Sequence, residues 1–361
     1  LSVASTAHAQ SVTTTDSTIT LATTVDAKTA VDQLNTGGTT ATINDANVKS
    51  GDGTAITSSS VLIDASSTTA NAVNNTSTPS LKDSGAAATS TTAGISVEQD
   101  NEANALAQTG AAATDGTEIK VTSGAATDSS LTISATLNRA AATGNTASTT
   151  ISDTDFTTNG TSATLAARQQ NTGATGEGNI SVTATVNDTD IKLTSAATSG
   201  SDLTISGNTD SAVATANSVT QQMTLDGTKL TLGTASATAN TAPSGTEAGV
   251  ADSDASGQAL VSSRQTNTFA DTAATNTASS ITLNAGATKG SSLEVSSNLQ
   301  DSTATGSTAG NTLALSGNAV GTGAAIVSTQ TSDSQSTVTA STTGATGITA
   351  ASLSKTADDL G

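Results

Sequence analysis

The sequence predicts an all-β fold, an elongated β-solenoid (β-helix) built from degenerate repeats. The first observation behind this prediction is a block at residues 119–134, which recurs at 191–206 and 281–296 with its apolar spacing intact. The second is the alternation of apolar residues with Ser and Thr in segments such as 130–139 and 179–188, which is the period of a half-buried strand.

Each block predicts a strand, a turn and a second strand. In residues 119–134 one apolar pair, Ile119 and Val121, is followed by a second pair, Leu131 and Ile133. Alternation places both pairs on one face, with Thr, Ser or Lys on the other. The other two copies carry the equivalent pairs Ile191/Leu193 with Leu203/Ile205, and Ile281/Leu283 with Leu293/Val295.

The repeat extends beyond this block. In each copy a further apolar residue follows at equal spacing, namely Leu81, Ile151, Met223 or Leu313. After it comes Ile95, Leu165 or Val327, and each of these three opens a segment that contains a Gln. The third copy reaches its equivalent, Val261, only after an insertion. Four copies, anchored near Val61, Leu131, Leu203 and Leu293, therefore occupy most of the chain, and such a period indicates stacked supersecondary units.

The predicted division of the chain follows from these copies. It comprises a signal-peptide remnant (1–9), an N-terminal strand and cap (10–47), four repeats (48–116, 117–188, 189–278 and 279–345) and a C-terminal tail (346–361). Residues Ala27 to Leu34 could form a short helical turn, and the inserted loop 234–258 is expected to protrude as a recognition surface. Rungs of roughly 25–35 residues, about 4.8 Å apart, would give a rod about 50–70 Å long.

Composition limits the core to a thin one. The chain has no Cys, Trp or Tyr, and its only aromatic residues are Phe156 and Phe269. A string of small β-sandwich modules is the alternative architecture, but modules of about 70 residues with so few large apolar side chains would be marginally stable. Disorder is a further alternative, and the conserved periodicity of the copies argues against it.

Charge and residue types exclude several classes of function. The net charge is −19 with only 11 Lys plus Arg, which excludes nucleic acid as a partner and disfavours direct docking or insertion into a membrane. His8, the only histidine, is expected to leave with the signal segment, and the chain has no Cys, so the usual activating partner of a nucleophile is missing. The chain is therefore expected not to be an enzyme, with no catalytic residue and no cofactor-binding residue.

Two polar patterns have an ordinary interpretation and a functional one. Short acidic clusters at 153–155, 187–190 and 252–254 resemble calcium-binding turns, but no complete calcium loop is present, so they are interpreted as solvated turns and no metal ligand is predicted. Arg168 and Arg264 occupy corresponding positions of two copies and predict a repeated salt bridge to a neighbouring carboxylate, or a partner contact. Arg139 is another of the few cations.

The N-terminal segment predicts export, and the last residues bear on how the protein would be held at a cell. Ala7, His8 and Ala9 before Gln10 have the small-x-small form of a secretory cleavage site. The last residues, SLSKTADDLG, are polar and offer no anchor, so a protein retained on a cell would be held by partner proteins.

With the Ala-His-Ala-Gln segment and the Cys-free, Thr/Ala/Ser/Asn-rich repeats, the chain resembles the secreted β-rich adhesins and surface-fibre subunits of Gram-negative bacteria. Within that group it resembles the alphaproteobacterial holdfast-anchor proteins, which tether an adhesive polysaccharide to the cell pole. The resemblance implies a secreted or cell-surface protein of adhesion and biofilms, associated with the outer membrane through partners.

Two functions are therefore expected. The first is an extracellular structural or adhesive β-rod, a subunit of a surface fibre or anchor that self-associates by end-to-end strand contacts. The alternative is a secreted solenoid that binds polysaccharide or, through rows of Thr, ice. Self-association, partner surface proteins and polysaccharide are thus the candidate interactions, and no cofactor is expected.

Overall fold

The structure is a computed structural model that describes residues 4–14, 18–21, 27–83, 88–89, 92–110, 116–153, 156–157, 162–173, 179–227, 231–232, 259–317, 320–321, 324–343, 347–351 and 354–355. Every regular element in these ranges is a β-strand, and the strands form seven sheets. The described strands pair in parallel, and each ladder joins strands of different repeats, for example β13 with β19 and β14 with β20. The predicted all-β solenoid is confirmed, and separate sandwich modules are excluded.

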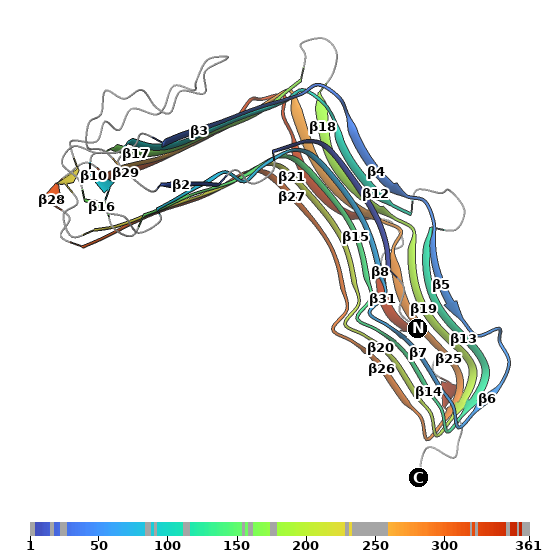
Figure 1. Ribbon diagram of the computed structural model, residues 1–361. Helices are drawn as coiled ribbons and strands as arrows, with labels where there is room; N and C mark the ends of the chain where they lie inside the picture. The colour runs from blue at the N-terminus through green and yellow to red at the C-terminus, as the bar shows by residue number, and fades with distance from the viewer. Residues whose placement is uncertain are drawn as a thin grey trace.

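One rung shows the path of the chain. It comprises β15 (Leu137–Asp153), β16 (Phe156–Thr157), β17 (Ser162–Thr172), β18 (Ile180–Asn187), β19 (Thr189–Ser199) and β20 (Asp202–Ser206). Seen along the stacking axis, the rung is an L with two layers (Figure 1). The inner layer is β20 and β15, which passes through the elbow into the first arm. The outer layer is β17, which returns to the elbow, and β18 and β19, which run down the second arm.

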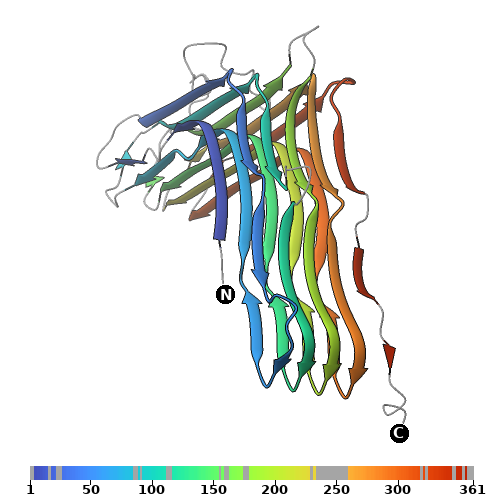
Figure 2. The same cartoon turned by 90° about the vertical axis from the view of Figure 1, so that its right-hand side faces the viewer.

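The other rungs repeat this path, as the side view shows (Figure 2). The first contains β1 (Ala4–Thr14), β2 (Thr18–Leu21), β3 (Ala27–Asn35), β4 (Thr39–Ile43), β5 (Ala46–Ser50), β6 (Ile56–Thr57) and β7 (Ser60–Asp64). The second contains β8 (Ser67–Ser77), β9 (Ser80–Asp83), β10 (Ala88–Thr89), β11 (Thr92–Asn101), β12 (Ala105–Thr109), β13 (Thr117–Thr127) and β14 (Ser130–Ser134).

Two rungs follow the one that begins with β15. The fourth contains β21 (Thr209–Gly227), β22 (Thr231–Leu232), β23 (Ala259–Thr268), β24 (Ala270–Thr277), β25 (Ser280–Lys289) and β26 (Ser292–Ser296). The last contains β27 (Leu299–Gly317), β28 (Val320–Gly321), β29 (Ala324–Ser332), β30 (Val338–Thr343), β31 (Gly347–Ala351) and β32 (Ser354–Lys355).

The apolar columns predicted from the sequence are confirmed. Leu131 pairs with Val61 on one side and Leu203 on the other, and Leu203 pairs with Leu293. Likewise Ile151 lies between Leu81 and Met223, and Met223 pairs with Leu313. Residues at equal places in the copies are therefore direct neighbours in the stack.

The predicted rung length is wrong, because one whole copy makes one rung. Successive members of the Leu131 column are 70 (131 − 61), 72 (203 − 131) and 90 (293 − 203) residues apart. Five rungs at a spacing of about 4.8 Å extend only about 20 Å along the stacking axis, so the predicted rod length is also wrong for a single chain. The long dimension lies within the rung instead (Figure 1).

Two local predictions are corrected as well. The column of Leu165 and Val261 continues at Ile326, whereas Val327 pairs with Ser262, so the predicted column was displaced by one residue. The predicted helical turn at Ala27 to Leu34 is the strand β3, which pairs with β11 and buries Val31 and Gln33. Pairing with a neighbouring rung overrides the weak local helix propensity.

Some predicted segments have only partial structural counterparts. β1 includes residues of the predicted signal remnant, and its Ala4 to Ala9 pair with β8. β31 and β32 lie within the predicted tail and pair with β25. The predicted loop 234–258 lies outside the described residues.

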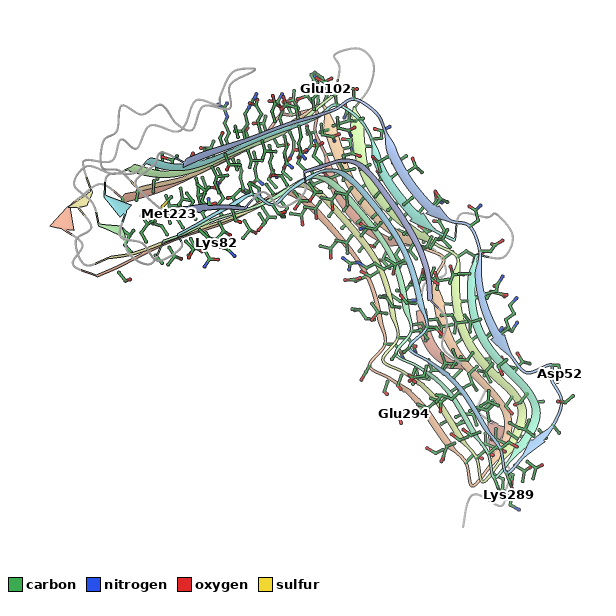
Figure 3. The ribbon with its side chains drawn as sticks, viewed as in Figure 1. Asp52, Lys82, Glu102, Met223, Lys289 and Glu294 are labelled. Atoms are coloured by element: carbon green, nitrogen blue, oxygen red, sulfur yellow. The ribbon has the colours of Figure 1, made fainter. Side chains whose placement is uncertain are left out.

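The core is a thin sheet of side chains between the two layers (Figure 3). The end of the second arm is aliphatic, and Leu131, Ile133 and Ile191 are fully buried there. Nearer the elbow the second arm is filled mainly by alanine, including Ala140, Ala184 and Ala212. The first arm returns to larger residues, among them Leu81, Ile95, Ile151, Leu165 and Met223.

Candidate functional site

A ladder of glutamines runs through the whole stack near the elbow. Gln33, Gln99, Gln169, Gln265 and Gln330 occupy one column of β3, β11, β17, β23 and β29. The Nε2 of each donates to the Oε1 of the preceding glutamine, at 2.7, 2.8, 2.8 and 2.7 Å from Gln99 to Gln330. The first four are at most 2% exposed, so the ladder satisfies amides that would otherwise be buried without partners.

The same glutamines join the two layers. The Nε2 groups of Gln33, Gln99, Gln169 and Gln265 also donate to the carbonyl oxygens of Thr76, Thr146, Ser218 and Thr308, at 2.7–2.9 Å. These carbonyls belong to the inner-layer strands β8, β15, β21 and β27. Each of these side chains therefore fixes both the neighbouring rung and the facing layer.

Two columns of asparagine face each other across the elbow beside this ladder. The outer-layer column is Asn35, Asn101, Asn171 and Asn267, and the inner-layer column is Asn75, Asn145 and Asn217. Asn101 donates to Asn171 at 2.9 Å and Asn145 to Asn217 at 2.9 Å, along the stack. Asn171 also donates to Asn217 at 2.9 Å, across the two layers.

At Gly144 the inner layer leaves no room for a side chain beside these amides, although the same column holds Asn74 and Ala216 in other rungs. A Cβ on Gly144 would lie 2.6 Å from the Asn171 Oδ1 and 2.6 Å from the Ala216 carbonyl oxygen. Such distances are far inside van der Waals contact, so Gly144 permits the close approach of the two layers at the elbow.

A serine ladder fixes the turn at the end of the second arm. The backbone N–H groups of Ser59, Ser129 and Ser201 each donate to the Oγ of the serine in the following rung, at 3.1–3.2 Å. The last acceptor is Ser291. The hydroxyl groups of these serines donate to the carbonyl two residues earlier, as Ser129 does to Thr127 at 2.7 Å. These bonds specify the register at the tip as the glutamines do at the elbow.

The C-terminal end of the stack exposes positions that are buried elsewhere. Ile326 and Val338 are 50% and 51% exposed, whereas the residues paired with them, Val261 and Thr272, are 0% and 1% exposed. These side chains point inward, and no described rung follows to cover them. The asparagine columns end here, with Ser307 and Ser332, while the glutamine column continues to Gln330.

The strands of this last rung lack the usual protection of sheet edges. Asp301 and Lys355 are the only charged residues in β27 to β32, and these strands contain no proline. Natural edge strands are commonly blunted by lysine, proline or bulges, because unpaired backbone groups can pair with another chain. The last rung is therefore a surface suited to strand pairing.

A buried acid, Asp210, lies between the layers of the second arm. Its two carboxylate oxygens accept hydrogen bonds from Nδ2 of Asn138 at 2.9 Å and Nδ2 of Asn276 at 3.0 Å. Burial raises the pKa of the Asp210 carboxyl, while hydrogen bonds from Ser279, Asn276 and Asn138 oppose this shift. The side chain is 0% exposed, so this acid is placed to affect stability rather than to meet a substrate.

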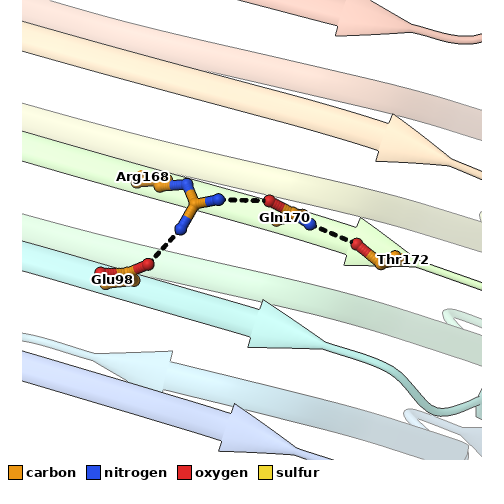
Figure 4. A network of polar contacts seen from close by, with 4 residues as sticks. All are labelled: Glu98, Arg168, Gln170 and Thr172. Carbon is orange, nitrogen blue, oxygen red and sulfur yellow. Dashed lines mark hydrogen bonds and ion pairs between the residues drawn. The ribbon is translucent and has the colours of Figure 1, made fainter. Parts of the chain in front are cut away.

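The predicted salt bridge of Arg168 is confirmed on the outward face of the first arm. Its guanidinium pairs with Glu98 of the preceding rung and donates to the Oε1 of Gln170 at 2.6 Å (Figure 4). Burial raises the pKa of Glu98, and the charge of Arg168 opposes that shift. The predicted repetition of this salt bridge at Arg264 is wrong: Arg264 pairs with Arg168 in register, but within the described ranges neither Arg264 nor Arg139 forms an ion pair.

Among the described residues, the other candidate sites bring together few groups that could bind a metal or a ligand. Within the part of the chain that the structure describes, no three acidic or histidine side chains cluster as metal ligands do. Of the predicted acidic turns, Asp188 and Asp190 are described, whereas residues 154–155 and 252–254 lie outside the described ranges. No helix that could span a bilayer occurs among the described residues. A shallow groove is lined only by hydroxyl side chains, those of Thr143, Thr146, Thr215, Ser218, Thr305 and Thr308.

Comparisons of this chain with models of known protein families, with curated proteins and with solved structures found no match.

Sequence analysis found one part of this site and missed another. It noted the glutamines of the repeated segments but did not infer that they form a ladder. It missed the asparagine columns, although Asn75, Asn145 and Asn217 lie one copy apart in the sequence. A repeated polar residue at the spacing of the apolar columns is the signal that could have found them.

Proposed function

We propose that this chain is an extracellular structural or adhesive protein, whose copies stack through their terminal rungs into a surface fibre or anchor. The observation that carries the proposal is the last rung, which exposes the inward-facing Ile326 and Val338 and has only two charged residues in its strands. Secretion, retention on the outer membrane through partner proteins, and adhesion belong to the same proposal and draw on the resemblance to surface-fibre subunits.

Backbone pairing supplies the driving force for stacking. A parallel rung ends in a row of unpaired N–H and C=O groups, and a second chain can add its strands to that row. Covering Ile326 and Val338 would also remove apolar surface from water, at about 25 cal/mol per Å². The net charge of −19 repels filaments from one another and favours growth along the axis over lateral clumping.

The hydroxyl-lined groove at the elbow favours a second function, the binding of a polysaccharide. Its columns, for example Thr143, Thr215 and Thr305, repeat with the rungs and offer both donors and acceptors without charge. A purified protein that remains monomeric and binds glycans would support this alternative.

Filament formation by the purified chain tests the leading proposal. Electron microscopy should show filaments of the wild type, and the double substitution Ile326→Lys/Val338→Lys should abolish them by placing two charges on the end face. The matched control is Thr339→Lys, an exposed residue beside Val338 in β30, which should still form filaments. Circular dichroism should show the same β content in all three proteins. Wild-type protein that stays monomeric at every concentration, or filaments unaffected by the double substitution, would overturn the proposal.

A further inference from the structure

We infer that the contact between copies has a single polarity and register, in which the last rung of one copy pairs in parallel with the first rung of the next and Gln330 stacks on Gln33. This inference rests on the proposed function and names the surface of the partner copy. It is carried by the complementary ends, by the residues that the continued columns bring together, and by the incomplete bonding of Gln330.

The two ends of the stack are complementary, because at each end one layer extends beyond the layer that faces it. The described chain begins in the inner layer with β1 and β2 and finishes in the outer layer with β29 to β32. At the start, β4 contacts both β1 and β8 of the facing layer, and Ile43 is only 8% exposed. At the finish, β30 contacts β27, no inner-layer strand follows, and Val338 is 51% exposed. The inner-layer strand β1 of a second copy, of which residues 10–14 would remain after the predicted cleavage before Gln10, would supply the missing inner-layer neighbour of β30, whereas contact between two like ends would not.

The register inside the chain also determines which residues would meet. Following the columns through the five rungs places β4 on β30, with Thr39 on Val338 and Ala41 on Ala340. In the same way β3 lies on β29, with Thr29 on Ile326 and Asp32 on Thr329. No like charges oppose each other at these positions, and small or β-branched residues continue the inward columns.

Gln330 marks the register because its bonding is incomplete in a single copy. Each interior glutamine accepts a hydrogen bond at Oε1 from the following rung and donates to an inner-layer carbonyl of that rung, as Gln169 does with Gln265 and Ser218. Gln330 donates to Gln265 at 2.7 Å, and its Oε1 has no partner among the described residues. The next copy would bring Gln33 to that oxygen and, through the column of Thr76 and Ser218, the Thr13 carbonyl to its Nε2.

Engineered cysteines test this register because the chain contains none. Leu34 and Thr331 are outward-facing, exposed residues that the proposed junction makes direct neighbours, one from each copy. Their Cα atoms would lie about 5 Å apart, which suits a disulfide. Oxidised filaments of Leu34→Cys/Thr331→Cys should therefore give a ladder of covalent multimers on non-reducing gels, and reduction should return them to monomer.

The controls distinguish a failure of this register from a failure of the proposed function on which it rests. Leu34→Cys/Thr329→Cys moves one thiol two residues along the same face, to a Cα distance of about 8 Å, and should give at least tenfold less multimer. Each single substitution tests contacts between like ends and should give no dimer. Filaments that cross-link through the shifted pair or through a single cysteine would overturn the register while leaving the proposed function standing. If neither filaments nor multimers form in any variant, both fail.

Discussion

The tip of the second arm and the elbow solve the same packing problem with different chemistry. At the tip, stacked aliphatic side chains such as Leu131 and Ile133 fill the space between the layers. At the elbow the same inward positions hold amides, among them Gln169 and Asn171, which are equally buried. The tip is stabilised by removing apolar surface from water, whereas the elbow is stable only while its hydrogen bonds are complete.

The aliphatic side chains at the tip therefore supply mainly stability, whereas the buried amides at the elbow supply register, as the serine ladder does at the turn of the tip. The aliphatic column tolerates exchange, since Val61 stands in line with Leu131 and Leu203. The glutamine column is occupied by glutamine in all five rungs. A strand slipped by two residues keeps its faces and would still bury apolar surface at the tip, but it would leave buried amides unpaired at the elbow, at a cost of about 1–3 kcal/mol each.

The largest expected effect is a cavity at the tip. Ile133→Ala removes a fully buried side chain and should lower the free energy of unfolding by about 2–5 kcal/mol in urea denaturation. Thr132→Ala, on the outward face of the same strand, is the matched control and should change it by about 0.5 kcal/mol or less. Equal effects of the two substitutions would contradict the assignment of the buried face.

A break in the glutamine ladder should come next. Gln169→Leu keeps the volume but leaves the Oε1 of Gln99 without its donor, so we expect a loss of about 1–3 kcal/mol by the same denaturation measurement. Gln170→Leu replaces the neighbouring outward-facing amide and should have a smaller effect. An unchanged or increased stability of Gln169→Leu would show that burial alone holds the elbow.

The buried acid should make stability depend on pH. Because burial raises the pKa of Asp210 above the unfolded value of 3.8, the folded state binds the proton more tightly. Its contribution is therefore fully present below pH 3.8 and is lost as pH rises through the folded pKa. Asp210→Asn should remove this loss and raise the free energy of unfolding at pH 7 more than at pH 4, as measured in urea.

The exposed Asp202→Asn is the control for that substitution and should not reproduce the difference between the two pH values. A destabilised Asp210→Asn at pH 7 would mean that the ionised carboxylate is the form that the fold requires.

The smallest effect should come from the outward ion pair. Arg168→Gln removes the contact between an arginine side chain that is 27% exposed and the Glu98 side chain that is 9% exposed, and because water reaches the guanidinium we expect a loss of about 0–1 kcal/mol. Arg264→Gln, which has no ion pair among the described residues, should change stability still less. A loss at Arg168 as large as that of Ile133→Ala would show that this ion pair stabilises the stack as strongly as the aliphatic core does.

The alternation of apolar and polar residues predicted which side chains face the core. The sequence did not predict which distant strands pair. Apolar spacing identified the columns of Leu131 and Ile151, because period two states which face a residue occupies. Apolar spacing could not predict how many residues make one rung, because each strand pairs with a strand of the next copy rather than with its neighbour in the sequence. Near the ends of strands it slipped by one residue, as at Val327, because apolar residues occur on both faces there. The asparagine columns were missed because a lone asparagine is usually interpreted as a turn residue.

Mass per unit length of the filaments, from scanning transmission electron microscopy, tests the stacked-rung account most directly. Five rungs of about 4.8 Å per chain of 34.6 kDa predict about 14 kDa per nanometre. A value near 6 kDa per nanometre would mean rungs of roughly 30 residues and would contradict the account.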